Sequence, residues 1–62
     1  MHTYVITFKA NGHYEMSAPC TGLSAARRWH KWYSAQAFAS KVRIMFGGPG
    51  GIEISARTGK PV

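Results

Sequence analysis

Aspartate is absent from this 62-residue sequence, and its acidic side chains are two glutamates, Glu15 and Glu53. Eight lysines and arginines outnumber them and give a formal net charge of +6 at pH 7. Glutamates on two separate segments do not form the carboxylate pair of general acid–base catalysis, and no aspartate is present to orient a histidine. The composition therefore predicts a protein that is not an enzyme and whose partners carry negative charge.

Cysteine is nearly absent as well, and no apolar run approaches the ~20 residues of a membrane-spanning helix. A single cysteine, Cys20, forms no internal disulfide, so the fold must hold without one, as is usual in a reducing compartment. We expect Cys20 to be a small buried apolar residue at the end of a strand. Because no signal-peptide pattern is present, we predict a cytoplasmic protein with no membrane partner.

Metal-binding and phosphate-binding motifs are also missing. The spacings of His2, His13, His30 and Cys20 match no zinc motif. The glycine-rich segment 47–51, GGPGG, lacks the lysine and the following helix of a phosphate-binding loop. We therefore predict no metal and no other cofactor, and we interpret segment 47–51 as the tip of a hairpin.

Four segments alternate apolar and polar residues, as half-buried strands do, and a helical pattern lies between the second and the third. The strand segments are 3–9, 13–18, 41–46 and 52–57, and the helix begins near Leu23. A chain of this length has room for one small core. The pattern predicts an α+β fold in the order β-β-α-β-β, with one four-stranded, mainly antiparallel sheet and a single helix packed on one face.

The chain is expected to form a single domain, 1–62, that ends in a loose tail at 58–62. The first hairpin is predicted to turn through three residues, Ala10–Gly12, with Gly12 in the left-handed conformation, because this register places the apolar residues of both strands on one face. The expected pairs are Phe8 with Tyr14, Ile6 with Met16 and Tyr4 with Ala18, and, in the second hairpin, Phe46 with Ile52 and Ile44 with Ile54. The open face of the sheet is then polar and without aromatic side chains, which argues against the stacking of nucleobases there.

The helix is predicted to be amphipathic, with an apolar arc toward the sheet and a basic arc toward solvent. The expected apolar arc contains Leu23, Ala26, Trp29, His30, Tyr33 and Ala37. We expect Trp29 to lie in the core and His30 to be half-buried. Trp32 lies at the border of this arc, one turn after Arg28, and an exposed tryptophan beside an arginine is a frequent combination at binding hot spots.

Two basic surfaces are predicted, one on the outer side of the helix and one on the open face of the sheet. The sheet surface is expected to include His13 among its cations. The candidate partner-binding residues are Arg27, Arg28, Lys31 and Trp32 of the helix, and Lys9, Lys41, Arg43 and Arg57 of the sheet.

The segment from Tyr14 to Ile44 resembles small phage-encoded proteins, including compact anti-CRISPR inhibitors, in its layout. The layout is a strand YEMSAP, a linker CTGLS, a helix that begins AARRW and a returning strand KVRI. The resemblance covers about half of the chain. It implies a non-enzymatic phage or mobile-element protein that occupies a surface of a host nucleoprotein or protein complex. Many such inhibitors are acidic mimics of DNA, whereas this chain is basic, which favours an acidic protein patch or joint contact with protein and nucleic acid.

The leading hypothesis is therefore a small basic binding module that inhibits a host nucleic-acid-handling complex by occluding one of its surfaces. The alternative is a direct DNA- or RNA-binding protein that uses the basic faces of the helix and the sheet, with affinity that falls as salt rises. A third reading is a homodimer that extends its sheet or covers Trp32 in a self-interface.

Overall fold

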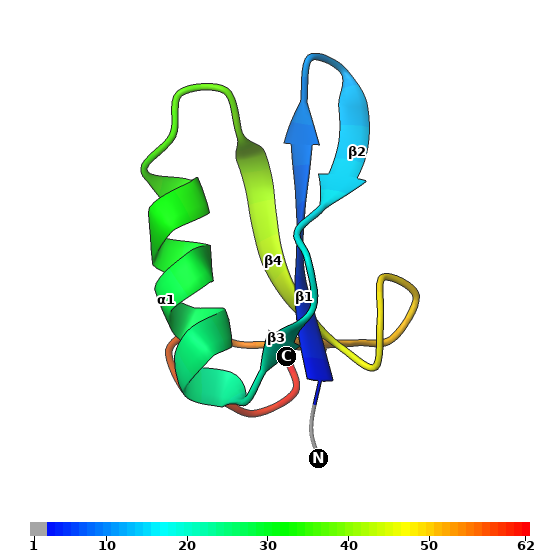
Figure 1. Cartoon of the computed structure of the whole chain (residues 1–62), viewed down its shortest axis with the longest axis vertical. Coiled ribbons are helices and arrows are strands. Elements are labelled where there is room, and N and C mark those ends of the chain that lie inside the picture. The colour runs from blue at the N-terminus through cyan, green and yellow to red at the C-terminus, as the bar shows by residue number, and fades with distance from the viewer. Residues whose placement is uncertain (1–2) are drawn as a thin grey trace.

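The computed structural model describes residues 3–62, and in this part of the chain one helix packs on one face of an antiparallel sheet of five strands (Figure 1). The elements are β1 (Thr3–Ala10), β2 (His13–Met16), β3 (Cys20–Thr21), α1 (Leu23–Ser34), β4 (Ser40–Phe46) and β5 (Ile52–Ile54). The predicted α+β class and element order are confirmed. One strand more is present than predicted, because Cys20 and Thr21, which were expected to lie in the linker before the helix, form the short strand β3.

The strands lie in the order β2-β1-β4-β5, and β3 pairs with β1 on the edge that β2 also uses. Ser17 joins the two pieces of this edge. Its backbone N–H donates to the carbonyl oxygen of Ile6 at 2.9 Å, and the backbone N–H of Ile6 donates to Ser17 Oγ at 3.0 Å. The side chain of Ser17 thus takes the place of a backbone carbonyl where the ladder is interrupted.

The register predicted for the first hairpin is wrong. The turn contains two residues, Asn11 at φ 53° and Gly12 at φ 81°, as in the type I′ turn that matches the twist of paired strands. The observed pairs are Thr7 with Met16, Phe8 with Glu15, Lys9 with Tyr14 and Ala10 with His13. The left-handed conformation expected for Gly12 is present, but the preference of Asn-Gly for a two-residue turn prevails over the alternation of apolar residues. Tyr14 and Met16 therefore lie on the open face of the sheet.

The second hairpin has the predicted register. Phe46 pairs with Ile52 and Ile44 with Ile54. The following segment, 58–62, was expected to be a loose tail but folds back on β5 through hydrogen bonds: Lys60 O accepts from Ser55 N, and Glu53 O from Val62 N. Figure 1 shows this segment, in red, beside the start of α1.

The core lies between α1 and the sheet, where Ile6, Ile44 and Ala26 are fully buried. Its other buried members are Phe8, Ala10, Cys20 and Ile54. Cys20 is buried at the start of β3, as predicted. The small Ala26 side chain allows the helix to approach the sheet closely.

Trp29 does not lie in the core, contrary to prediction. At ~100° per residue it lies roughly 60° to the side of Ala26, on the flank of the helix, and it is 47% exposed. The aromatic side chain of α1 that packs against the core is Tyr33, whose ring stacks on Phe8 with centroids 4.5 Å apart. His30 is half-buried as predicted, and its Nε2 donates to the carbonyl oxygen of Val42 at 3.2 Å.

A bulge interrupts the pairing of β1 with β4. Thr7 pairs with Arg43 but Lys9 pairs with Ser40, so β4 carries one extra residue. Lys41, in this bulge, has φ 51°, a conformation that is strained for a side chain with a Cβ atom. The α1 helix of 12 residues is too short to cross a membrane, and the described part of the chain contains no other candidate span.

Candidate binding surfaces

Two tryptophans stand side by side on the flank of α1. Trp29 is 47% and Trp32 49% exposed, and their rings meet edge to face with centroids 5.9 Å apart. They border a hollow of about 570 Å³, the helix-face hollow. Its lining residues are Ala25, Arg28, Trp29, Trp32 and Tyr33. Exposed apolar surface of this kind in so small a chain is typical of an interaction site.

The helix leaves both indoles half exposed because other side chains of α1 contact the core. Ala26 belongs to the core and Tyr33 packs against it, whereas Trp29 and Trp32 do neither. Beside Trp29, a smaller hollow of about 140 Å³ separates α1 from the linker 17–19. At the far end of the helix the aromatic surface continues to Phe38, which is also exposed and lies 6.5 Å from Trp32 between ring centroids.

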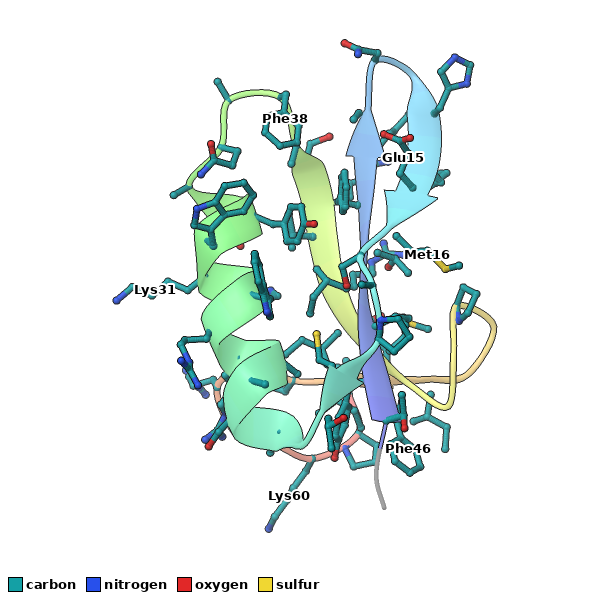
Figure 2. All side chains as sticks on the ribbon, viewed as in Figure 1. Glu15, Met16, Lys31, Phe38, Phe46 and Lys60 are labelled. Atoms are coloured by element: carbon teal, nitrogen blue, oxygen red, sulfur yellow. The ribbon has the colours of Figure 1, made fainter. Side chains whose placement is uncertain are left out.

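The three predicted cations of the helix do not act as one group. Arg28 lines the helix-face hollow, and Lys31 points away from the sheet into solvent (Figure 2). Arg27 extends instead to the C-terminal segment, where its guanidinium donates to the carbonyl oxygen of Arg57 at 3.4 Å. The structure thus places Arg28 beside the tryptophans, leaves Lys31 extended into solvent and places Arg27 with Arg57.

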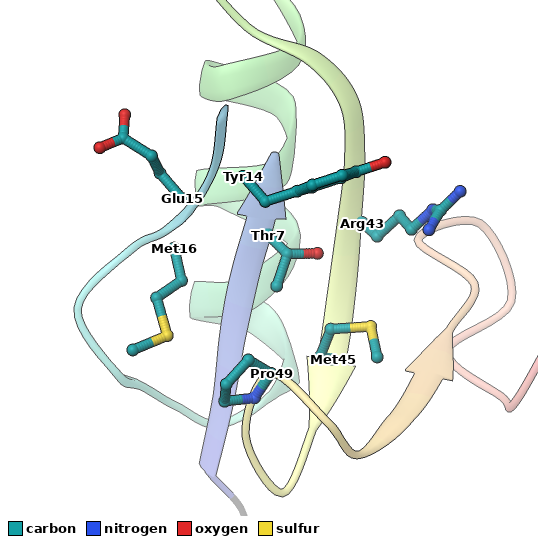
Figure 3. A pocket seen from close by; sticks show the side chains of 7 residues that line it. All are labelled: Thr7, Tyr14, Glu15, Met16, Arg43, Met45 and Pro49. Atoms are coloured by element: carbon teal, nitrogen blue, oxygen red, sulfur yellow. The ribbon is translucent and has the colours of Figure 1, made fainter. Parts of the chain in front are cut away.

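A second hollow, the sheet-face hollow, lies on the opposite side of the sheet and has a volume of about 470 Å³ (Figure 3). It is lined by Thr7, Tyr14, Met16, Arg43, Met45 and Pro49. The ring of Tyr14 extends across β1 toward Arg43, and Pro49 of the glycine-rich loop lies at the other end. Glu15 borders this hollow, with its carboxylate turned away from it.

The predicted cations of the sheet are only partly brought together. Lys9 and Arg43 lie on the open face; the Lys9 ammonium is 5.7 Å from the centre of the Tyr14 ring. Arg43 Nε lies 3.9 Å from an oxygen of Glu53, with both side chains about half exposed, which makes a weak surface ion pair. Lys41 is held in the bulge of β4. His13 was expected on the open face, but its pairing with Ala10 places it on the face that carries the core.

Trp29 and Tyr14 contribute to these surfaces, although neither was predicted from the sequence to do so. The Asn-Gly pair at 11–12 was the indication that could have placed Tyr14 correctly, because it favours a two-residue turn. For Trp29 the indication was Ala26, whose small side chain marks the line of closest approach between helix and sheet.

Metal-binding groups are not assembled in the described part of the chain. Among residues 3–62, no three His, Cys, Asp or Glu side chains are placed so that they could hold a metal ion. His2, one of the histidines considered from the sequence, lies outside the described residues. Comparisons of the chain with protein-family models, curated proteins and solved structures found no match. The two hollows are therefore interpreted from their own geometry.

Proposed function

We propose that this protein is a non-enzymatic binding module that docks on an acidic, partly apolar protein surface through the flank of α1. The observation that carries this proposal is the pair Trp29 and Trp32, each about half exposed, on the wall of one hollow beside Arg28. Tryptophan and arginine are the residue types most enriched among those that dominate binding energy at protein interfaces.

The arrangement has the composition of a protein–protein contact. The two indoles and Ala25 supply an apolar centre, Arg28 adds a positive charge at its border, and Lys31 adds a second charge that extends from the same helix into solvent. A partner that places an apolar side chain in the helix-face hollow and its own carboxylates around it would match both the apolar centre and the cations. The helix carries no acidic residue, so its cations have no partner of opposite charge on α1 itself.

The kind of partner is proposed from composition and layout. The basic charge of the chain and its layout resemblance to small phage-encoded inhibitors suggest a host nucleoprotein or protein complex that handles nucleic acid. Binding on the helix flank would occlude a surface of that complex and inhibit it, as anti-CRISPR proteins do. We propose that this occurs in the cytoplasm of the host cell.

The proposal is tested with affinity-tagged protein and a matched pair of double variants. Arg28→Glu with Lys31→Glu reverses two charges on α1, one of them in the lining of the helix-face hollow, and Lys41→Glu with Arg43→Glu makes the same charge change on β4. Each protein is incubated with host lysate that has been treated with nuclease, and the bound proteins are quantified by mass spectrometry. Thermal melting of each variant checks that its fold is retained.

We expect the parent to recover one defined protein complex. The helix variant should recover at least ten-fold less of this complex than the parent, and the β4 variant should recover as much as the parent. Reversal of charge adds repulsion against an acidic partner, so its effect exceeds that of simple removal. Equal recovery by parent and helix variant, or recovery of no defined protein complex by the parent from the nuclease-treated lysate, would overturn the proposal.

A further inference from the structure

We infer that the sheet-face hollow is a site for single-stranded nucleic acid, in which a base stacks on Tyr14 and the backbone phosphates meet Lys9 and Arg43. This site lies on the side of the sheet opposite α1 and does not rest on the function proposed for the helix. The observed register of the first hairpin places Tyr14 and Met16 on the open face of the sheet.

Tyr14 has the exposure and orientation that stacking requires. It is 62% exposed, and Figure 3 shows its ring nearly edge-on, so that one ring face looks into the hollow toward Thr7 and Met45. Aromatic side chains on open sheets hold unpaired bases in this way, and the contact tolerates any sequence because every base has a flat π face. A base within a duplex is already stacked, so the preference is for single strands.

The rest of the hollow suits a base better than it suits a protein side chain with a carboxylate. Met16 and Met45 provide polarisable thioethers, which make favourable contacts with aromatic rings. Pro49 closes the end opposite Tyr14 with a rigid apolar ring. A volume of about 470 Å³ is within the range of sites that take small aromatic ligands.

Charge on this face favours a phosphate backbone. The ammonium group of Lys9 lies over the ring of Tyr14, and Arg43 borders the hollow. The carboxylate of Glu53 is 3.9 Å from Arg43 Nε, and a surface pair of this kind holds the guanidinium weakly. Arg43 is therefore free to turn toward a phosphate, with which it forms stronger bidentate hydrogen bonds. Glu15 turns its carboxylate away from the hollow.

The test measures fluorescence anisotropy of labelled strands of about 12 nucleotides, a length within the usual range for such sites. The probes are oligothymidine, oligouridine and an abasic strand with the same backbone. The proteins are the parent, Tyr14→Phe, Tyr14→Leu and, as a control on the other face, Trp32→Leu. Since Tyr14 and Trp32 are both exposed, these variants are expected to fold, and melting curves verify this.

We expect the parent to bind at least one base-containing strand about tenfold more tightly than the abasic strand, and Tyr14→Leu to lose about tenfold in affinity. Tyr14→Phe and Trp32→Leu should bind as the parent does. Binding of only the thymidine or only the uridine strand would assign the site to DNA or to RNA. Arg43→Gln should reduce the slope of log affinity against log salt by about one.

Three results would overturn the inference. The first is an affinity for the abasic strand equal to that for the base-containing strands. This would show that the face binds negative charge alone, which an acidic protein could equally supply. The second is a Tyr14→Leu variant that binds like the parent. The third is nuclear magnetic resonance data in which the strand shifts the indole signals of Trp29 and Trp32 but leaves the methyl signals of Met16 and Met45 in place.

Discussion

Lys9 stands opposite Tyr14 in the pairing of β1 with β2, and its ammonium nitrogen lies 5.7 Å from the centre of the Tyr14 ring. The two side chains share the open face because the turn at Asn11 and Gly12 contains two residues. A turn longer by one residue would carry Tyr14 to the opposite face and leave Lys9 without it. The chemistry of this face is therefore set by the conformation of a turn that makes no contribution to the hollow itself.

Ser17→Ala should reduce the free energy of unfolding by about 1–2 kcal/mol, because it leaves the partly buried N–H of Ile6 without the Oγ acceptor at 3.0 Å. Ser34→Ala is the matched control: Ser34 is exposed at the end of α1, and its replacement should change stability by less than about 0.5 kcal/mol. Urea denaturation measures both. Equal stability of the two variants would mean that Ser17 does not hold the interrupted edge together.

Gly59→Ala should be costly for two reasons. Gly59 has φ 76°, and a Cβ atom there would lie 2.7 Å from Cδ2 of Leu23. We expect a loss of about 1–2 kcal/mol, measured by thermal or urea denaturation. Gly50→Ala is the control, since a Cβ atom on Gly50 meets nothing within 4 Å and its φ is not left-handed. If Gly59→Ala were as stable as Gly50→Ala, the C-terminal segment would not be packed on α1 in solution.

Trp29→Ala should cost less than about 2 kcal/mol of stability, whereas Tyr33→Ala should cost about 3 kcal/mol or more. The difference follows from burial: Trp29 is 47% exposed, while Tyr33 stacks on the buried Phe8. Chemical denaturation of the two variants compares them directly. A larger loss of stability for Trp29→Ala than for Tyr33→Ala would mean that Trp29 lies in the core and that the helix presents a different side to the sheet.

Lys41→Gly should raise the stability of the protein by about 1 kcal/mol. Lys41 adopts φ 51° in the bulge of β4, and glycine reaches this region without the steric cost of a Cβ atom. Lys41→Ala serves as the control, because it removes the same side-chain charge and keeps the Cβ atom. A stability gain shared by both variants would attribute the effect to charge, and no gain in either would argue against the strained bulge.

The sequence predicted the second hairpin better than the first for a physical reason. At β4 and β5 the pairing of Phe46 with Ile52 follows from alternation alone, since the glycine-rich loop is flexible enough to accept the register that buries the apolar face. At β1 and β2 the turn is short and has its own strong preference, so alternation and turn geometry disagree and the turn prevails.

The candidate surfaces were predictable in part. The positions of Arg28, Lys31 and Trp32 follow from helical periodicity, and the structure places all three as exposed residues. Trp29 was misplaced because helical periodicity put it in the middle of the expected apolar arc, whereas the helix packs on the core through Leu23, Ala25, Ala26 and Tyr33. The divergence of Arg27 toward Arg57 depends on the folded position of the C-terminal segment, which no local pattern in the sequence indicates.

The central claim, that the flank of α1 is the surface on which the partner lies, is tested most directly by site-specific photo-crosslinking. A photoreactive residue replaces Arg28 in one protein and Lys41 in another, and both are irradiated in nuclease-treated host lysate. The account predicts a protein adduct of one defined mass from position 28 and none from position 41. Adducts of equal yield from both positions, or from position 41 alone, would contradict it.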